Sequence, residues 1–166
     1  QVVVDGQAWS VPLPGEHNGA NLVAALLAAR SLGLEDGTIR EGLRHFAGSA
    51  HRGVLLEIGG RLVLDDSYNA NPSSMHAAID TLALAEGERW LVLGDMAELG
   101  ADARALHAGV GRHARERGIQ KVFAVGPLSV AAVEAFGAGG THYADKAALI
   151  EALRAQVRAG VTCLVK

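Results

Sequence analysis

The hydrophobic positions of this chain follow two periods, which together predict a mixed α/β fold. Short apolar runs that end in turn residues are typical of strands, and longer segments with apolar residues every three or four positions are typical of helices. Strands are predicted at 54–57, 61–65, 90–93, 121–125, 142–143 and 161–165, and helices at 73–85, 103–117, 128–136 and 146–158. Because strands and helices alternate, we expect βαβ units and a Rossmann-like, mainly parallel sheet with flanking helices.

The first part of the chain has a separate pattern. Asp5-Gly6 lies between two short apolar runs and predicts a tight hairpin turn. Helices are predicted over 18–32 and over about 35–45. Residues 48–53 are small and polar, as linkers are. We therefore expect a domain boundary that divides the chain into residues 1–49 and 50–166.

Composition and charge narrow the class of protein. With 166 residues and 49% hydrophobic content, the chain can build a sizeable core. A formal net charge of -3 does not indicate nucleic-acid binding, and no apolar run is long enough for membrane insertion. The lone cysteine, Cys163, lies in an apolar run and is expected in the core, and the lack of a disulfide framework fits the cytoplasm. The first residue is not methionine, so we expect a fragment, and nothing in the pattern indicates an oligomeric state.

The densest polar cluster follows the predicted strand 61–65. Residues 65–71 carry polar side chains at every position except Ala70, and Pro72 then starts a helix. In open α/β sheets, ligands bind at the carboxyl ends of strands. The same residue types also form turns, which is the structural alternative. A turn does not need so many of them, and the cluster therefore favours a ligand site.

A second motif is the loop Gly15-Glu16-His17-Asn18-Gly19-Ala20-Asn21, which leads into a helix. Asn18 suits the N-cap position, and this structural role weighs as much as a ligand contact. Asn21 neither caps nor packs well in a first turn. Two amides three positions apart share one face of a helix and can read the edge of a nucleotide base.

His51-Arg52 forms a third motif, in the expected linker. An arginine in a linker is commonly solvated, and that remains the simpler interpretation of the local sequence. The guanidinium fork also matches phosphate oxygens bidentately, which suits phosphoryl transfer.

The fourth motif, Gly94-Asp95-Met96-Ala97-Glu98-Leu99-Gly100, follows another apolar strand. Two acids at a second strand end indicate the same crevice as the first cluster. Alternatively, Glu98 and Asp102 favour the positive end of the following helix.

Several other site motifs are missing from the sequence. The histidines show no metal-ligand spacing, so no metal ligands are predicted in this chain. There is no Gly-x-x-x-x-Gly-Lys-Ser/Thr phosphate loop either. If the protein handles ATP, its main phosphate loop lies outside this chain.

Taken together, the four motifs resemble those of the Mur ligase family of peptidoglycan synthesis. Their order and spacing match over nearly the whole chain, including Ser74-Met75 after the first cluster. The segments Tyr-Asn-Ala-Asn at 68–71 and Gly-Asp-Met-Ala-Glu-Leu-Gly at 94–100 point to the branch that adds D-alanyl-D-alanine.

The resemblance implies a three-domain enzyme, in which residues 1–49 end the central ATP-binding domain and residues 50–166 form the C-terminal domain. Such ligases use ATP and Mg²⁺ to convert a carboxylate into an acyl phosphate, which an amine attacks to give an amide. In this branch the substrates are UDP-N-acetylmuramoyl-tripeptide and D-alanyl-D-alanine. The phosphate-loop lysine, a carbamylated lysine and most contacts to Mg²⁺ would lie outside this chain, so the chain alone is expected to be inactive.

The resemblance also implies residue roles. Asn18 and Asn21 match adenine contacts, and Asp66 matches the carboxylate that meets the ribose. Arg52 matches the catalytic arginine that reaches the phosphates of ATP. Contacts to the amine substrate are expected among Ser67, Tyr68, Asn69, Asn71 and Asp95. One residue departs from the pattern, since this branch usually has glycine where this chain has His51.

Two other functions remain open at this point. One is a related ligase, either another Mur ligase or a folylpolyglutamate synthase-like enzyme, although Tyr68-Asn69-Ala70-Asn71 argues against both. The other is a non-catalytic Rossmann-like module that binds a nucleotide, which would also explain the missing phosphate loop. The length of the whole gene discriminates between ligase and module.

Overall fold

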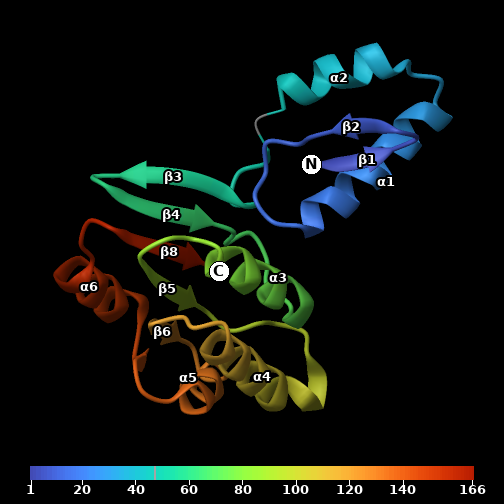
Figure 1. Cartoon of the computed structure of the whole chain (residues 1–166). Helices are drawn as coiled ribbons and strands as arrows, with labels where there is room; N and C mark the ends of the chain where they lie inside the picture. Colours follow the sequence, from blue (N-terminus) through green and yellow to red (C-terminus); the bar gives the residue numbers. More distant parts are fainter. Residues whose placement is uncertain (47) are drawn as a thin grey trace. The chain divides into compact units, whose positions relative to one another are not determined.

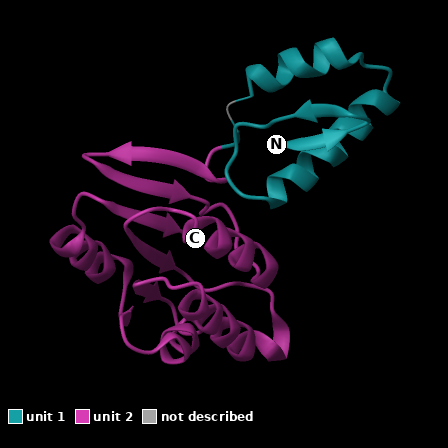
Figure 2. Cartoon of the chain, viewed as in Figure 1, with its two compact units in different colours: residues 1–49 teal, residues 50–166 magenta. Residues whose placement is uncertain are grey.

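The computed structural model describes residues 1–46 and 48–166, which divide into two compact units. The first unit comprises residues 1–49 and the second residues 50–166 (Figure 2). Each unit has a hydrophobic core of its own. None of the described helices has both the length and the apolar character that crossing a bilayer requires.

The first unit is a short hairpin that packs with two helices. Its elements are β1 (Val2–Val4), β2 (Gln7–Trp9), α1 (His17–Ser31) and α2 (Asp36–Arg44) (Figure 1). The strands pair antiparallel, and the turn residues Asp5 and Gly6 have φ of 50° and 74°. Positive φ at both positions is what a type I′ turn requires, so the predicted hairpin is confirmed. The buried core of this unit is Trp9, Leu22 and Leu26.

A six-stranded sheet with the order β3-β4-β8-β5-β6-β7 forms the centre of the second unit (Figure 1). Its strands are β3 (Val54–Ile58), β4 (Arg61–Asp65), β5 (Glu88–Leu93), β6 (Lys121–Val125), β7 (Gly140–Tyr143) and β8 (Val161–Val165). Only the β3–β4 pair is antiparallel among these strands, and the other four pairs are parallel. The predicted mainly parallel sheet is confirmed.

Helices cover both faces of this sheet. They are α3 (Pro72–Ala83), α4 (Ala103–Glu116), α5 (Val130–Phe136) and α6 (Lys146–Gln156), with the 3₁₀ turn η1 (Gly100–Asp102) before α4. Residues of α3, α4 and α5 pack with Leu91 and Leu164 on one face, and α6 packs with Trp90 and Phe123 on the other (Figure 1). Because side chains alternate along a strand, the apolar runs of β5 and β8 supply both cores.

The close contact between α4 and α5 depends on Gly111. A Cβ atom at this position would lie 2.0 Å from the carbonyl oxygen of Ala132, which no side chain can accommodate. Glycine therefore allows the two helices to approach at backbone distance.

The element boundaries agree closely with the sequence pattern. β4, β6 and β8 begin and end as predicted, whereas β5 and β7 begin two residues earlier, at Glu88 and Gly140. Cys163 is buried in the core as expected, and burial raises the pKa of its thiol to about 12. That thiol is therefore a packing residue, with almost no thiolate at neutral pH.

Candidate functional site

The backbone ladder of the sheet continues past the ends of β4, β8 and β5. The amide of Asp66 donates to Val165 O at 3.0 Å, and that of Lys166 donates to Val92 O at 2.9 Å. Gly94 then donates to Lys166 O at 3.0 Å. The polar cluster after β4 and the glycine-bracketed loop after β5 therefore start on either side of Lys166, at the carboxyl ends of these three strands.

Asp65 is the centre of a small hydrogen-bond network at the end of β4. Its Oδ1 accepts from Ser67 Oγ at 2.6 Å and from Ser67 N at 3.2 Å, and its Oδ2 lies 2.8 Å from His51 Nδ1. Partial burial by itself raises the pKa of Asp65, but the hydrogen bonds from Ser67 and His51 outweigh it and hold the pKa below its usual value. The ionised carboxylate therefore ties His51 to the start of the polar cluster.

His51 and Arg52 are attached to the polar cluster in two further ways. His51 has a φ of 60°, a left-handed conformation that is rare for residues with a side chain, and its carbonyl accepts from Tyr68 N at 3.0 Å. The guanidinium carbon of Arg52 lies 3.8 Å from the centroid of the Tyr68 ring, within the range of a cation–π contact. Both side chains are exposed. The guanidinium group of Arg52 is thus held at the surface, near the carboxyl end of β4.

Asp66, which follows Asp65 in the sequence, has a different partner. Its carboxylate Oδ2 forms an ion pair with Lys166 Nζ, and the same Nζ lies 3.5 Å from Asp66 O. The Lys166 side chain is only 2% exposed, against 25% for that of Asp66. The aspartate that is expected to bind the ribose is therefore held by an ion pair with a buried lysine.

The two asparagines of the cluster serve the start of α3. Asn71 is the N-cap of that helix: its Oδ1 accepts from Ser74 N at 2.9 Å, and its own amide donates to Ser74 Oγ at 3.1 Å. Pro72 occupies the first helical turn, as expected. Asn69 Oδ1 accepts from Ala70 N at 2.8 Å. The side-chain oxygens of both asparagines are therefore bonded to backbone amides, while both residues remain exposed.

In the loop after β5, Asp95 holds the start of α5. Its Oδ1 accepts from Ser129 N at 2.7 Å and from Leu128 N at 3.1 Å. Gly126 packs directly against it, since a Cβ there would lie 2.4 Å from Asp95 Oδ1. The regular helix begins at Val130, two residues later than predicted, and Asp95 binds the amides of the two residues before it.

The same loop is fixed by a buried histidine. His107 Nδ1 lies 2.7 Å from Ala103 O, a carbonyl that can only accept, so this nitrogen carries the proton. Nε2 is then free to accept from Met96 N at 2.9 Å. Of the two acids before α4, Asp102 occupies the N-cap position without a side-chain cap bond, and Glu98 is exposed with a φ of 61°.

In the first unit, Asn18 and Asn21 form a pair, but Asn18 is not the N-cap. Helix α1 begins at His17 with Glu16 in the cap position, because the backbone already turns at Gly15 and Glu16. Asn18 Nδ2 instead donates to Pro14 O at 2.7 Å, and Asn21 Nδ2 donates to Asn18 Oδ1 at 3.2 Å. The N-cap prediction is wrong, whereas the prediction that the two amides share a helix face is confirmed.

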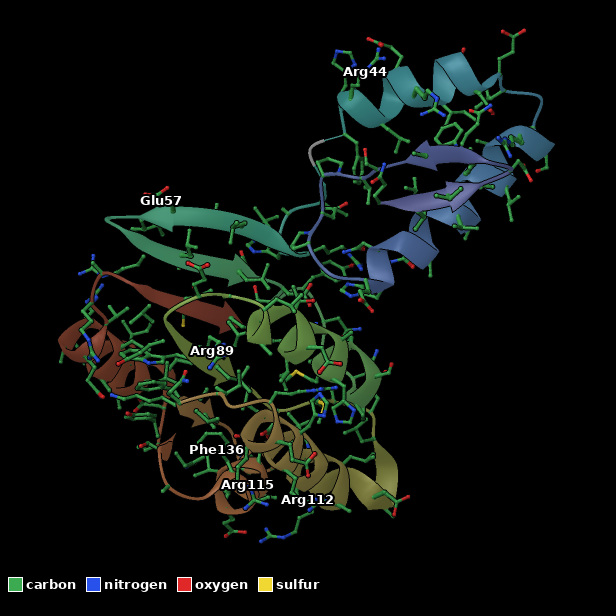
Figure 3. All side chains as sticks on the ribbon, in the orientation of Figure 1. Arg44, Glu57, Arg89, Arg112, Arg115 and Phe136 are labelled. Carbon is green, nitrogen blue, oxygen red and sulfur yellow. The ribbon has the colours of Figure 1, made fainter. Side chains whose placement is uncertain are left out.

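The other histidines form no metal site. No group of three or more His, Cys, Asp or Glu in residues 1–46 and 48–166 is arranged to hold a metal ion. His76 of α3 and His113 of α4 stack with 4.3 Å between ring centroids, and His113 Nε2 lies 2.7 Å from Asp80 Oδ1. Arg112 and Arg115 lie on the exposed side of α4 (Figure 3).

Sequence reasoning missed Lys166 and His107 as parts of this region. His107 gives no local signal, since its partners lie in a loop whose path depends on the fold. Lys166 carries one: it follows the apolar run of β8, and the pairing of β4 with β8 places it opposite Asp66.

Comparison with known proteins identifies close relatives. The profile of the family described as "Mur ligase, glutamate ligase domain" matches residues 51–166. The UDP-N-acetylmuramoyl-tripeptide–D-alanyl-D-alanine ligase of Escherichia coli (strain K12) is 44% identical over 159 residues, which cover 94% of this chain and 35% of that protein. A crystal structure of MurF from Acinetobacter baumannii superposes with a TM-score of 0.83 at 32% identity, covering 94% of this chain and 35% of that one.

A more distant solved structure shares the fold alone. The bifunctional folylpolyglutamate synthase/dihydrofolate synthase from Yersinia pestis CO92 superposes with a TM-score of 0.67 at 19% identity, over 97% of this chain and 38% of that one. The chain spans about a third of the length of the curated relatives that it matches.

Proposed function

The chain belongs to the Mur ligase family, and on that premise we propose that it is part of an ATP-dependent, ADP-forming ligase that joins D-alanyl-D-alanine to UDP-N-acetylmuramoyl-tripeptide. The observation that carries this proposal is the 44% identity, over 94% of the chain, to the Escherichia coli ligase of that name. Because the chain corresponds to about a third of such relatives, the activity is assigned to the longer protein. The likeness to folylpolyglutamate synthase extends to the fold only and does not favour that alternative.

The division of the chain supports a domain assignment. Residues 1–49 would be the C-terminal part of the central ATP-binding domain, and residues 50–166 would be the C-terminal domain of the ligase. The second compact unit begins at Ala50, and the family profile begins at residue 51. Each unit buries hydrophobic residues of its own, which is consistent with two domains.

The reaction consists of two displacements. An oxygen of the tripeptide carboxylate attacks the γ-phosphorus of ATP, and ADP leaves with the electrons of the broken phosphorus–oxygen bond. The amino nitrogen of D-alanyl-D-alanine then attacks the carbonyl carbon of the acyl phosphate, phosphate leaves, and the nitrogen loses a proton. This is a step of peptidoglycan precursor synthesis, and its need for ATP and a UDP-linked substrate places it in the cytoplasm.

We assign the nucleotide contacts residue by residue. Arg52 is proposed to bind the transferring phosphate, since its guanidinium is exposed and oriented by Tyr68. Asp66 is proposed to accept a hydrogen bond from the ribose. The paired amides of Asn18 and Asn21 are proposed to contact adenine, for which they offer both a donor and an acceptor.

Contacts to the amine substrate are proposed for the polar residues after β4 and β5. Ser67, Tyr68 and Asn69 are exposed at the end of β4 and can present side-chain groups to a ligand. Asn71 and Asp95 accept hydrogen bonds from backbone amides, so their contribution would come mainly from holding α3 and α5 in place.

Magnesium is proposed as the metal that accompanies ATP. The described residues contain no cluster of three acidic or histidine ligands, whereas Mg²⁺ takes its ligands from substrate phosphates together with a few carboxylates. The metal would therefore be held by ATP and by residues outside this chain.

The proposal is tested with the full-length protein that carries this chain. ADP release is followed with UDP-N-acetylmuramoyl-tripeptide, ATP and Mg²⁺, with and without D-alanyl-D-alanine, and the product is identified by mass. Release that depends on D-alanyl-D-alanine supports the proposal. Release with L-glutamate and a folate in place of both substrates, or none with any pair, would contradict it.

Two variants sharpen this experiment. Arg52→Lys keeps the charge but loses the fork, and we expect kcat to fall by about tenfold or more. The 166-residue chain by itself is expected to show no turnover, because it contains no phosphate loop. Ligase activity of that isolated chain would refute the assignment of the missing functions to the longer protein.

A further inference from the structure

The ion pair between Lys166 and Asp66 joins two neighbouring parallel strands. The register of β4 and β8 pairs Leu64 with Leu164 and Asp65 with Val165. Continued by one residue, the same register places Asp66 opposite Lys166. The pairing therefore follows from the strand alignment itself and does not depend on a loop.

The direction of these side chains follows from strand geometry. Leu64 and Leu164 belong to the core on the side of the sheet that α3 covers. Side chains two residues apart in a strand lie on the same face of the sheet. Asp66 and Lys166 therefore lie on the same face as these two leucines, just past the carboxyl ends of β4 and β8. The pair closes the apolar core where the polar cluster begins.

The two members of the pair differ in their access to solvent. The Lys166 side chain is 2% exposed, so its amine cannot reach a ligand outside the protein. Among residues 1–46 and 48–166, the only hydrogen bonds of Lys166 Nζ are to Oδ2 and to the carbonyl oxygen of Asp66. A buried ammonium group needs such a partner, because an unpaired charge is costly in the interior. Any role of Lys166 must therefore act through Asp66.

Asp66 is the member that can meet a ligand. Its side chain is 25% exposed, and Lys166 occupies only one carboxylate oxygen, Oδ2. Within the described part of the chain, Oδ1 makes no hydrogen bond. A carboxylate that is held on one side has already lost its torsional freedom, so a further hydrogen bond on the other side costs less ordering.

We propose that Lys166 is a positioning residue, which holds Asp66 so that Oδ1 is presented to a ribose hydroxyl of bound ATP. The inference rests on the proposed function, because that function assigns the ribose to Asp66. In this arrangement the lysine contributes to nucleotide selectivity without touching the nucleotide. A lysine that only joined the two strand ends would stabilise the fold but leave this selectivity unchanged.

The experiment measures selectivity for the ribose in the full-length protein. The ratio of kcat/KM for ATP to kcat/KM for 2′-deoxy-ATP, and for 3′-deoxy-ATP, is determined for each variant. Because both rates come from one preparation, a fraction of unfolded enzyme cancels from the ratio. Lys166→Met and Lys166→Gln remove the charge, and Asp66→Ala removes the carboxylate. Lys121→Met is the matched control, because Lys121 lies at the amino end of β6, two strands away from β8, and bonds to Gln156.

We expect the wild-type enzyme to prefer ATP over one of the deoxy analogues by about tenfold or more, since the bond is made to a charged group. Asp66→Ala should abolish this preference, and both Lys166 variants should reduce it to about a third of the wild-type value or less. Lys121→Met should keep it.

Two results would overturn the inference, and they can be told apart. If both Lys166 variants keep the wild-type preference while Asp66→Ala loses it, Lys166 is only structural and the ribose role of Asp66 stands. If wild type and Asp66→Ala show the same preference, the ribose role is wrong and the role of Lys166 falls with it. In either case, D-alanyl-D-alanine-dependent ADP release tests the ligase activity separately.

Discussion

The guanidinium carbon of Arg52 lies 3.8 Å from the ring centroid of Tyr68, although Arg52 precedes β3 and Tyr68 follows β4. The two segments are also joined by the hydrogen bond from Tyr68 N to His51 O. An exposed arginine can adopt many rotamers, and this contact restricts them. This contact gives Tyr68 a role that differs from the amine-substrate contact that the family resemblance implies.

Substitutions of Tyr68 separate these two roles. Tyr68→Phe keeps the ring under Arg52 and should leave kcat within about twofold of wild type. Tyr68→Leu removes the cation–π contact, which is worth about 0.5–1 kcal/mol at an exposed site, and should lower kcat by about two- to fivefold. Steady-state kinetics of the full-length enzyme tests both. A rise in KM for D-alanyl-D-alanine with Tyr68→Phe would instead assign the hydroxyl group to the substrate.

His51 adopts a strained φ of 60°, and its side chain bonds to Asp65. Variants with glycine and with alanine at this position should therefore differ in stability. His51→Gly loses the bond but relieves the left-handed strain, whereas His51→Ala loses the bond and keeps the strain. We expect glycine to be more stable than alanine by about 1 kcal/mol in urea denaturation. Equal stability of the two variants would mean that the backbone at this position is not strained.

The stacked histidines make stability depend on pH. Burial lowers the pKa of His76, and the charge of His113 lowers it further, while Asp80 and Glu116 oppose the shift. Below the model-peptide pKa of about 6.5, the unfolded chain therefore binds more protons at His76 than the folded chain does. Stability should fall as the pH decreases from about 6.5 through the folded pKa.

The variant that tests this is His76→Phe, which keeps a ring against His113. Its melting temperature should fall less between pH 7.5 and pH 5.5 than that of the wild type. Asp80 and Arg117 form an ion pair beside the stack and remain in both proteins. If both proteins lose the same stability over this range, His76 does not carry the pH dependence.

Asp95 should contribute to stability through the start of α5. Asp95→Ala leaves the amides of Leu128 and Ser129 without their acceptor and should cost about 1–2 kcal/mol. Asp95→Asn keeps one acceptor oxygen and should cost less. Thermal denaturation orders the three proteins. An Asp95→Ala variant with full stability but a raised KM for D-alanyl-D-alanine would favour a direct substrate contact instead.

The α/β architecture could be predicted from the sequence, because the signals for it are local. Alternation of apolar runs with helical periods defines the strands and helices, and Asp5-Gly6 defines the hairpin turn. The polar cluster could be located for the same reason, since the apolar run of the strand ends at Leu64 and polar residues begin at Asp65. Family membership also followed from motif order along the chain.

The pairing of the polar residues, in contrast, depends on the folded arrangement of the chain. Lys166 meets Asp66 across a strand register that links positions one hundred residues apart, and Asp95 meets Leu128 and Ser129 across two strand ends. The capping of α3 by Asn71 and the displacement of Asn18 from its predicted cap depend on backbone geometry that residue type alone does not specify. A hydrogen bond is short and directional, so its partners are set by the folded arrangement of the chain, whereas hydrophobic periodicity is already present in the sequence.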